Sequence, residues 1–132
     1  MLKIKKNMEK KIFEMHQEHA EWLNKLSFYK DELGIMKSRL AEIAQKNSSG
    51  DVLAKVEHFQ NQFIVQAEQL DIVKHNINEH EVYLQQRLNE NQVAADRQTS
   101  SDSPQIRESV ESFERIFNGL RQEFNQFLSK TM

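Results

Sequence analysis

Three histidines have the residue type and spacing that metal chemistry needs. His16 and His19 stand three residues apart, so that one face of a helix carries both, and His80 lies on a second helical segment. If these segments run antiparallel, the three imidazoles meet at one end of the bundle, alone or with one carboxylate. Imidazole nitrogens bind zinc, iron or copper, so the cluster predicts a site for a single divalent metal ion or a haem iron.

The same histidines have a structural interpretation, which we favour from the sequence. A histidine on the apolar face of a helix is more often a core residue that is hydrogen-bonded to a neighbour. Di-iron sites of the ferritin type use Glu-x-x-His pairs, and no glutamate precedes any histidine here by three residues. Metal binding by His16, His19 and His80 is therefore the alternative interpretation.

The elements that position these histidines are three long helices. Apolar residues alternate at spacings of three and four over residues 12–43, 52–84 and 106–127, which places them on one seam of each helix. The chain has 132 residues with one Pro, three Gly and no Cys, a composition typical of long helices rather than of sheets or disulfide frameworks. We predict an all-α fold, an antiparallel three-helix bundle with long coiled-coil-like helices.

The helix boundaries follow from turn and cap signals. Gly50 suits a positive φ in the first turn, and Ser103 followed by Pro104 is a typical helix start. The polar segment 95–103 is therefore expected to be the second connection. The predicted organisation is a basic flexible segment at 1–7 and a bundle over 8–132, with helices at about 8–46, 51–92 and 103–130.

A tight first turn also predicts the register. Residues that face each other across the first two helices have numbers that sum to roughly 95. Tyr29 then faces Gln66, and we expect their polar groups to bond each other and to specify the register. The third helix is expected to pass the histidines near Glu114 and Phe117.

The predicted helices carry apolar residues outside the seams, and these residues predict self-association. A third helix of about 28 residues is shorter than the other two, at about 40 each, and leaves the tip of the first hairpin partly uncovered. Further apolar residues, among them Phe28 near the level of Val65, form stripes beside the seams. We expect a homo-oligomer, with a dimer favoured, and a helical protein partner as the other occupant. The predicted interface consists of Phe28, Ile35, Met36, Leu40, Phe59, Phe63, Val65 and Ile72.

Other function classes find little support in the sequence. A net charge of −2 argues against nucleic-acid binding, and contact with a membrane surface through the basic residues 1–11 is a less favoured interpretation. There is no Gly-rich phosphate loop, nucleophile elbow or His-Glu-x-x-His motif, so we expect neither an enzyme nor a cofactor. The sequence thus favours a non-catalytic, cytoplasmic interaction or structural protein, with a metal- or haem-binding bundle as the alternative.

Overall fold

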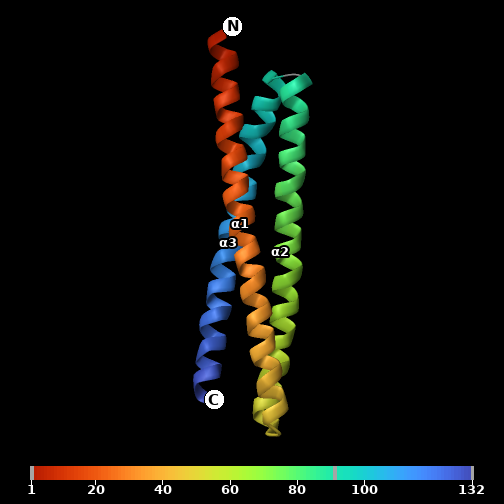
Figure 1. Ribbon diagram of the computed structural model, residues 1–132, viewed down its shortest axis with the longest axis vertical. Helices are drawn as coiled ribbons and strands as arrows, with labels where there is room; N and C mark the ends of the chain where they lie inside the picture. The colour runs from red at the N-terminus through yellow and green to blue at the C-terminus, as the bar shows by residue number, and fades with distance from the viewer. Residues whose placement is uncertain (1, 91, 132) are drawn as a thin grey trace. The chain divides into compact units, whose positions relative to one another are not determined.

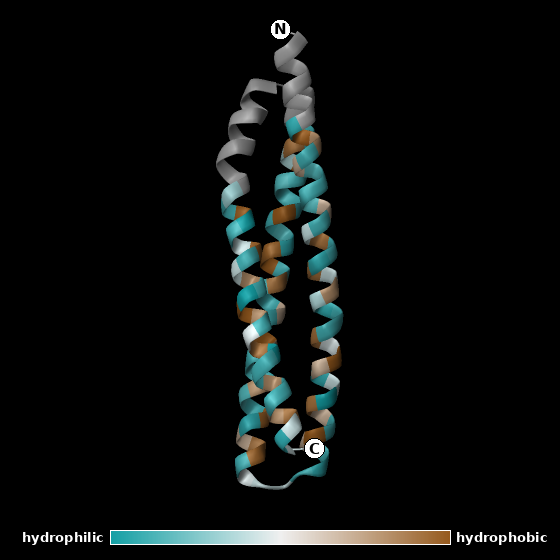
Figure 2. Cartoon of the chain, turned by 90° about the vertical axis from the view of Figure 1, so that its left-hand side faces the viewer, coloured by the Kyte–Doolittle hydropathy of each residue, from teal (hydrophilic) through white to brown (hydrophobic). Residues whose placement is uncertain are grey.

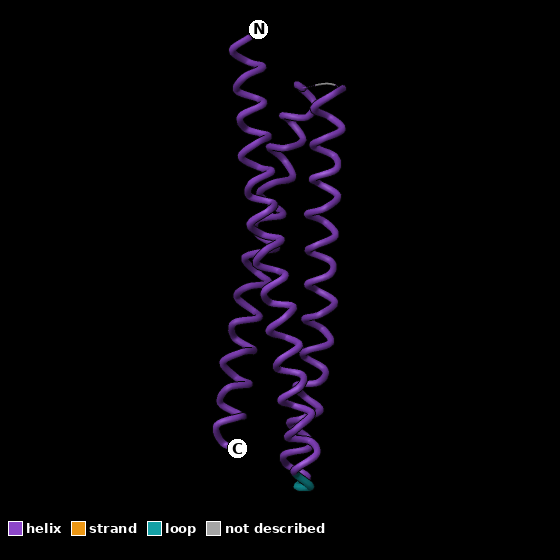
Figure 3. Tube along the Cα trace, viewed as in Figure 1, coloured by secondary structure: helices purple, strands orange, loops and turns teal. Residues whose placement is uncertain are grey.

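The computed structural model describes the backbone of residues 2–90 and 92–131, and the side chains of residues 11–86 and 104–131. Three helices make up almost all of this backbone, and Figures 1 and 3 show that no strand occurs in it. They are α1 (Leu2–Lys46), α2 (Gly50–Glu90) and α3 (Gln92–Thr131). The predicted all-α, antiparallel three-helix bundle is confirmed.

Helix α3 begins much earlier than the sequence signals indicated. It starts at Gln92 rather than near 103, so that the segment 95–103 is helical and Pro104 lies inside the helix. Polar residues such as Ser and Asp weaken a helix only modestly, whereas a proline in a helix interior costs about 3 kcal/mol, and α3 contains Pro104 in spite of this cost. The helices have 45, 41 and 40 residues, and the predicted difference in length is absent.

The two ends of α1 also differ from the predicted boundaries. The helix begins at Leu2, so the segment predicted to be flexible at 1–7 is helical from that residue on, while its side chains lie outside the described residues. At the other end, Asn47 Nδ2 donates to the carbonyl of Ile43 at 2.9 Å. Gly50 is the first residue of α2, and no described glycine has a positive φ, so the left-handed turn expected at Gly50 does not form.

The chain divides into two compact units, each built from one segment of every helix. The first unit combines Met1–Leu26 with Ile72–Glu111, and the second combines Ser27–Asp71 with Ser112–Met132. The sequence predicted one bundle over 8–132, because the heptad pattern runs through both units without interruption. The histidine cluster belongs to the first unit, and most of the phenylalanines belong to the second.

The core of the second unit is aromatic. Apolar side chains recur between polar ones along each helix, as Figure 2 shows by colour. The rings of Phe59, Phe63, Phe124 and Phe127 pack with centroids 5.2 to 6.3 Å apart. Phe124 is fully buried, and these rings join α2 to α3 in tilted and edge-to-face contacts that aromatic pairs prefer.

Four of the residues predicted at an interface belong to this core instead. Met36, Leu40, Phe59 and Phe63 are only 5%, 2%, 2% and 1% exposed. The sequence placed them on an uncovered hairpin tip because it made α3 too short. In the structure Phe124 of α3 packs on Phe59 and Phe63, so these four side chains stabilise the fold and are not available to a partner.

Two Arg–Glu pairs join α1 to α3, one in each unit. Arg107 Nη2 donates to both carboxylate oxygens of Glu18 at 2.8 and 2.9 Å, and Arg121 binds Glu32 through two hydrogen bonds of 2.5 Å. Both pairs span 89 residues of sequence. This register differs from the predicted one, which placed Glu114 and Phe117 at the histidines, because the start of α3 was misjudged.

The expected bond between Tyr29 and Gln66 is also absent. Gln66 is 3% exposed, and its side-chain Oε1 has no hydrogen-bond partner. The Tyr29 ring packs instead against Phe113 and Phe117 of α3, at centroid distances of 5.7 and 4.8 Å. A buried amide oxygen without a donor costs free energy, so Gln66 destabilises the second unit.

Replacing Gln66 by leucine should therefore stabilise the protein. We expect Gln66→Leu to raise the free energy of unfolding by about 1 to 2 kcal/mol, because the unpaired oxygen disappears and the volume stays similar. Urea denaturation followed by circular dichroism measures this change. The matched control is Gln69→Leu at an exposed position, and a loss of stability in Gln66→Leu alone would show that the amide is satisfied in solution.

Truncation in the aromatic core of the second unit should destabilise the protein more than truncation of an exposed ring. Phe124→Ala removes a ring that is 0% exposed, and we expect it to lower the free energy of unfolding by about 3 to 5 kcal/mol. Phe13→Ala, at a ring that is 60% exposed, should cost less than about 1 kcal/mol. The same denaturation experiment compares the two variants. Equal losses would contradict the assignment of Phe124 to the core.

Candidate histidine and carboxylate site

The candidate site joins two turns of α1 to one turn of α2 in the first unit. His19 and His80 occupy seam positions and are 1% and 5% exposed. His16 and Glu81 flank the seams, and their side chains are 55% and 17% exposed. The helical spacing therefore places one imidazole at the surface and two in the core, with the carboxylate between them.

Glu81 bridges the two histidines of α1. One carboxylate oxygen, Oε1, accepts from His16 Nδ1, and the other, Oε2, accepts from His19 Nδ1 at 2.5 Å. Gln85 Nε2 also donates to Oε1 at 3.3 Å. A carboxylate with donors on both oxygens is well placed to stay ionised.

The hydrogen bonds continue from His19 to His80. His19 Nε2 and His80 Nδ1 are 2.9 Å apart, and the two rings meet edge to face with centroids at 4.9 Å. When neutral His19 gives its Nδ1 proton to Glu81, its Nε2 carries the lone pair, so His80 Nδ1 is the donor. Trp22 packs against His19 at a centroid distance of 5.8 Å. The result is a hydrogen-bonded chain from Glu81 through His19 to His80.

The pKa of Glu81 reflects two opposing effects. Burial raises the pKa of this carboxyl, while the hydrogen bonds from His19 and His16 and the positive charge of these imidazoles lower it. The histidines prevail, and the pKa of Glu81 lies below its usual value of 4.5. Glu81 is therefore ionised over the neutral range.

The structure brings together the three histidines that the sequence singled out. His19 meets His80 within about one turn of the expected register. The carboxylate, however, comes from Glu81 on α2 and not from α3, because Glu81 lies on the flank of α2 that faces His16. That placement depends on how the helices are rotated, which the seam alone does not determine. His58 and His75 pair elsewhere, with Glu123 and Glu79.

The hydrogen bonds of this cluster join its groups in a row, from His16 and His19 to Glu81 and from His19 to His80, rather than around a common centre. Within residues 11–86 and 104–131, no three His, Asp or Glu side chains form a group that could hold a metal ion as they stand. Binding of a metal ion by His16, His19 and His80 thus stays a prediction. If all three histidines bound one metal ion, His19 would lose its hydrogen bond to His80, its hydrogen bond to Glu81, or both.

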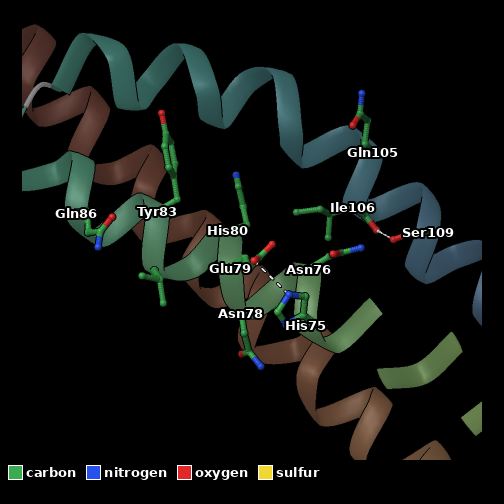
Figure 4. A pocket seen from close by; sticks show the side chains of 11 residues that line it. His75, Asn76, Asn78, Glu79, His80, Tyr83, Gln86, Gln105, Ile106 and Ser109 are labelled. Atoms are coloured by element: carbon green, nitrogen blue, oxygen red, sulfur yellow. Dashed lines mark hydrogen bonds and ion pairs between the residues drawn. The ribbon is translucent and has the colours of Figure 1, made fainter. Parts of the chain in front are cut away.

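A groove of about 900 Å³ lies beside the cluster, between α2 and α3 of the first unit. Figure 4 shows His80 and Tyr83 projecting from α2 toward α3, whose Ile106 side chain also reaches the groove. His75 and Glu79 form an exposed ion pair at 3.1 Å on the α2 side. His80 therefore belongs both to the groove wall and to the hydrogen-bonded chain that ends at Glu81.

In comparisons with known proteins, no family model, curated protein or solved structure matches the chain. Among the helices of the described residues, none has the length and apolar character to cross a membrane.

The lowered pKa of Glu81 predicts a specific dependence of stability on pH. The folded protein binds the Glu81 proton less readily than the unfolded chain, so this carboxylate contributes its full stability above about pH 4.5. The contribution is lost as the pH falls from 4.5 through the lower folded-state pKa. We expect Glu81→Gln to cost about 1 to 3 kcal/mol at pH 6, and the difference from wild type to shrink as the pH is lowered to 3.

Urea denaturation at several pH values, with a metal chelator present, measures this difference. The control is Glu79→Gln, which removes an exposed carboxylate that also pairs with a histidine and should cost less than about 0.5 kcal/mol throughout. A difference between wild type and Glu81→Gln that grows toward acid pH would contradict the role assigned to Glu81.

Proposed function

We propose that the protein is a cytoplasmic, non-catalytic helical-bundle module that associates with itself, with a dimer favoured. One observation carries the proposal: Phe28 and Ile35, one heptad apart on α1, are 63% and 58% exposed. Large apolar side chains in a regular stripe on a polar chain indicate a surface that is covered by another molecule. Self-association is the simplest way to cover them.

The surroundings of this stripe suit a protein interface. Phe28, Glu32 and Ile35 lie on one face of α1, because their spacing is four and then three residues. Glu32 is bound on both carboxylate oxygens by Arg121, whose guanidinium also lies over the Phe117 ring at 5.3 Å. The stripe therefore contains a carboxylate that is already neutralised, which lowers the cost of removing water from it.

A second exposed pair lies between α2 and α3 of the same unit. His58 Nε2 bonds Glu123 at 3.1 Å, Val65 follows His58 by one heptad, and Ile116 precedes Glu123 by one heptad. Since the two helices run antiparallel, Val65 and Ile116 face each other, 44% and 51% exposed. This register places Val65 beside Ile116 of α3.

We favour the α1 stripe because its side chains are larger and more exposed than those of the Val65 face. A two-fold axis at Phe28 and Ile35 would place the same stripe of a second copy against the first. A stable dimer buries about 800 Å² on each partner, so further residues must contribute. Other large apolar residues exposed in the second unit are Leu53, Ile64, Val65 and Ile116.

Charge in the α1 stripe should dissociate the assembly. We expect the wild-type chain to have the mass of a dimer, and Phe28→Glu with Ile35→Glu to have the mass of one chain, because two buried carboxylates oppose association. Light scattering after size exclusion, at two protein concentrations, measures the mass.

The matched control is Val65→Glu with Ile72→Glu, which introduces two glutamates at the same spacing on α2. These residues are 44% and 52% exposed, so the fold should tolerate the change. If the α2 variant dissociates and the α1 variant does not, the interface is on α2. A wild-type chain that stays monomeric at both concentrations would rule out self-association.

A further inference from the structure

We propose that His16, His19 and Glu81 form a binding site for one divalent transition-metal ion, with His80 orienting His19 from outside the ligand set. The site belongs to the first unit, whereas Phe28 and Ile35 belong to the second, and the inference does not depend on self-association. It differs from the ligand set suggested by the sequence in that Glu81 takes the place of His80.

The donor set has the chemistry of a metal site. Two imidazole nitrogens and one carboxylate oxygen form a two-histidine, one-carboxylate group, which leaves further coordination positions open to water. The two histidines share one face of α1, and Glu81 reaches them from α2, so that both Nδ1 atoms point at the same carboxylate. Inward-facing side chains of neighbouring helices commonly build metal sites in bundles.

The distances between the donor atoms show how far these three side chains must move to admit a metal ion. His19 Nδ1 lies 2.5 Å from Glu81 Oε2, with a proton between them. Around a tetrahedral zinc ion with bonds of about 2.0 to 2.2 Å, neighbouring donor atoms lie about 3.3 to 3.6 Å apart. Small rotations of the two imidazoles and the carboxylate would therefore open a space for the ion. The protons that now join the three groups occupy the place of the metal, which explains why the donors do not already surround a common centre.

The proton balance of this exchange involves His80. A metal ion on His19 Nδ1 requires the lone pair of that nitrogen, so the ring proton moves to Nε2. The proton of His80 moves in the same way from Nδ1 to Nε2. His19 Nε2 then donates to His80 Nδ1 across the same 2.9 Å, and the hydrogen bond is kept with its direction reversed. A metal-binding histidine normally donates its other ring N–H to a fixed acceptor, which sets its orientation. His80 is buried at 5% exposure and is well placed for this role.

The burial of the three ligands is graded from solvent to core. The side chains of His16, Glu81 and His19 are 55%, 17% and 2% exposed. An ion and its bound waters can therefore enter at His16, while His19 is held between Trp22 and His80. The negative charge of Glu81 offsets part of the charge of the ion on the buried side.

Titration of the untagged full chain, freed of metal with EDTA, tests the proposal. Zn²⁺ is followed by calorimetry and Co²⁺ by visible absorption at pH 7.5, and we expect one ion per chain. His16→Ala should weaken binding at least about tenfold without unfolding the protein, because this side chain is exposed. The control is His75→Ala, an exposed histidine that also pairs with a glutamate and should leave the affinity unchanged.

Imidazole nitrogen NMR gives an independent readout. Zn²⁺ should shift the Nδ1 resonances of His16 and His19, and Glu81→Gln should abolish these shifts while the helical circular dichroism spectrum is retained. Three outcomes would overturn the proposal: no saturable binding, half an ion per chain, or an equal loss of affinity in His75→Ala and His16→Ala.

Discussion

Contact between the apolar seams of the three helices is the constraint on which the rest of the molecule depends. Each seam admits very few polar side chains, because a buried polar group must find a partner or weaken the fold. His19 meets this requirement with both ring nitrogens, since Nδ1 bonds Glu81 and Nε2 bonds His80. Gln66 does not, since its Oε1 is buried without a donor. The difference marks His19 and Glu81 as an organised polar pair at an otherwise apolar seam.

Ion pairs beside the seams also constrain the orientation and register of the helices. The pairs Glu18–Arg107 and Glu32–Arg121 connect α1 and α3 across the same 89 residues of sequence, one in each unit. Ion pairs at flanking heptad positions set orientation and register more than they add stability. Arg121 is the better buried of the two arginines, and its hydrogen bonds to Glu32 raise its pKa further above the neutral range. The guanidinium of Arg121 therefore stays charged over the neutral range.

Features with a short-range signal could be predicted from the sequence. The helical seams, the first turn and the approach of His19 to His80 follow from a regular spacing of three and four residues. The start of α3 could not, because residues 92–103 have no seam and their cap signals suited a connection. That error made α3 too short, and it moved Met36 and Phe63 from the core to a supposed interface. The role of Glu81 depends on how the helices are rotated about their axes, which the spacing of residues in the sequence does not determine.

The chain from Glu81 to His80 is directional, and this has a consequence for its buried end. Each imidazole in the chain carries one proton, so the group bound at His19 Nδ1 determines which nitrogen of His19 holds that proton, and then which nitrogen of His80. His80 Nε2 is buried. Replacement of the His19 Nδ1 proton by a cation would move the proton of His80 from Nδ1 to Nε2, and so convert a buried acceptor into a buried donor.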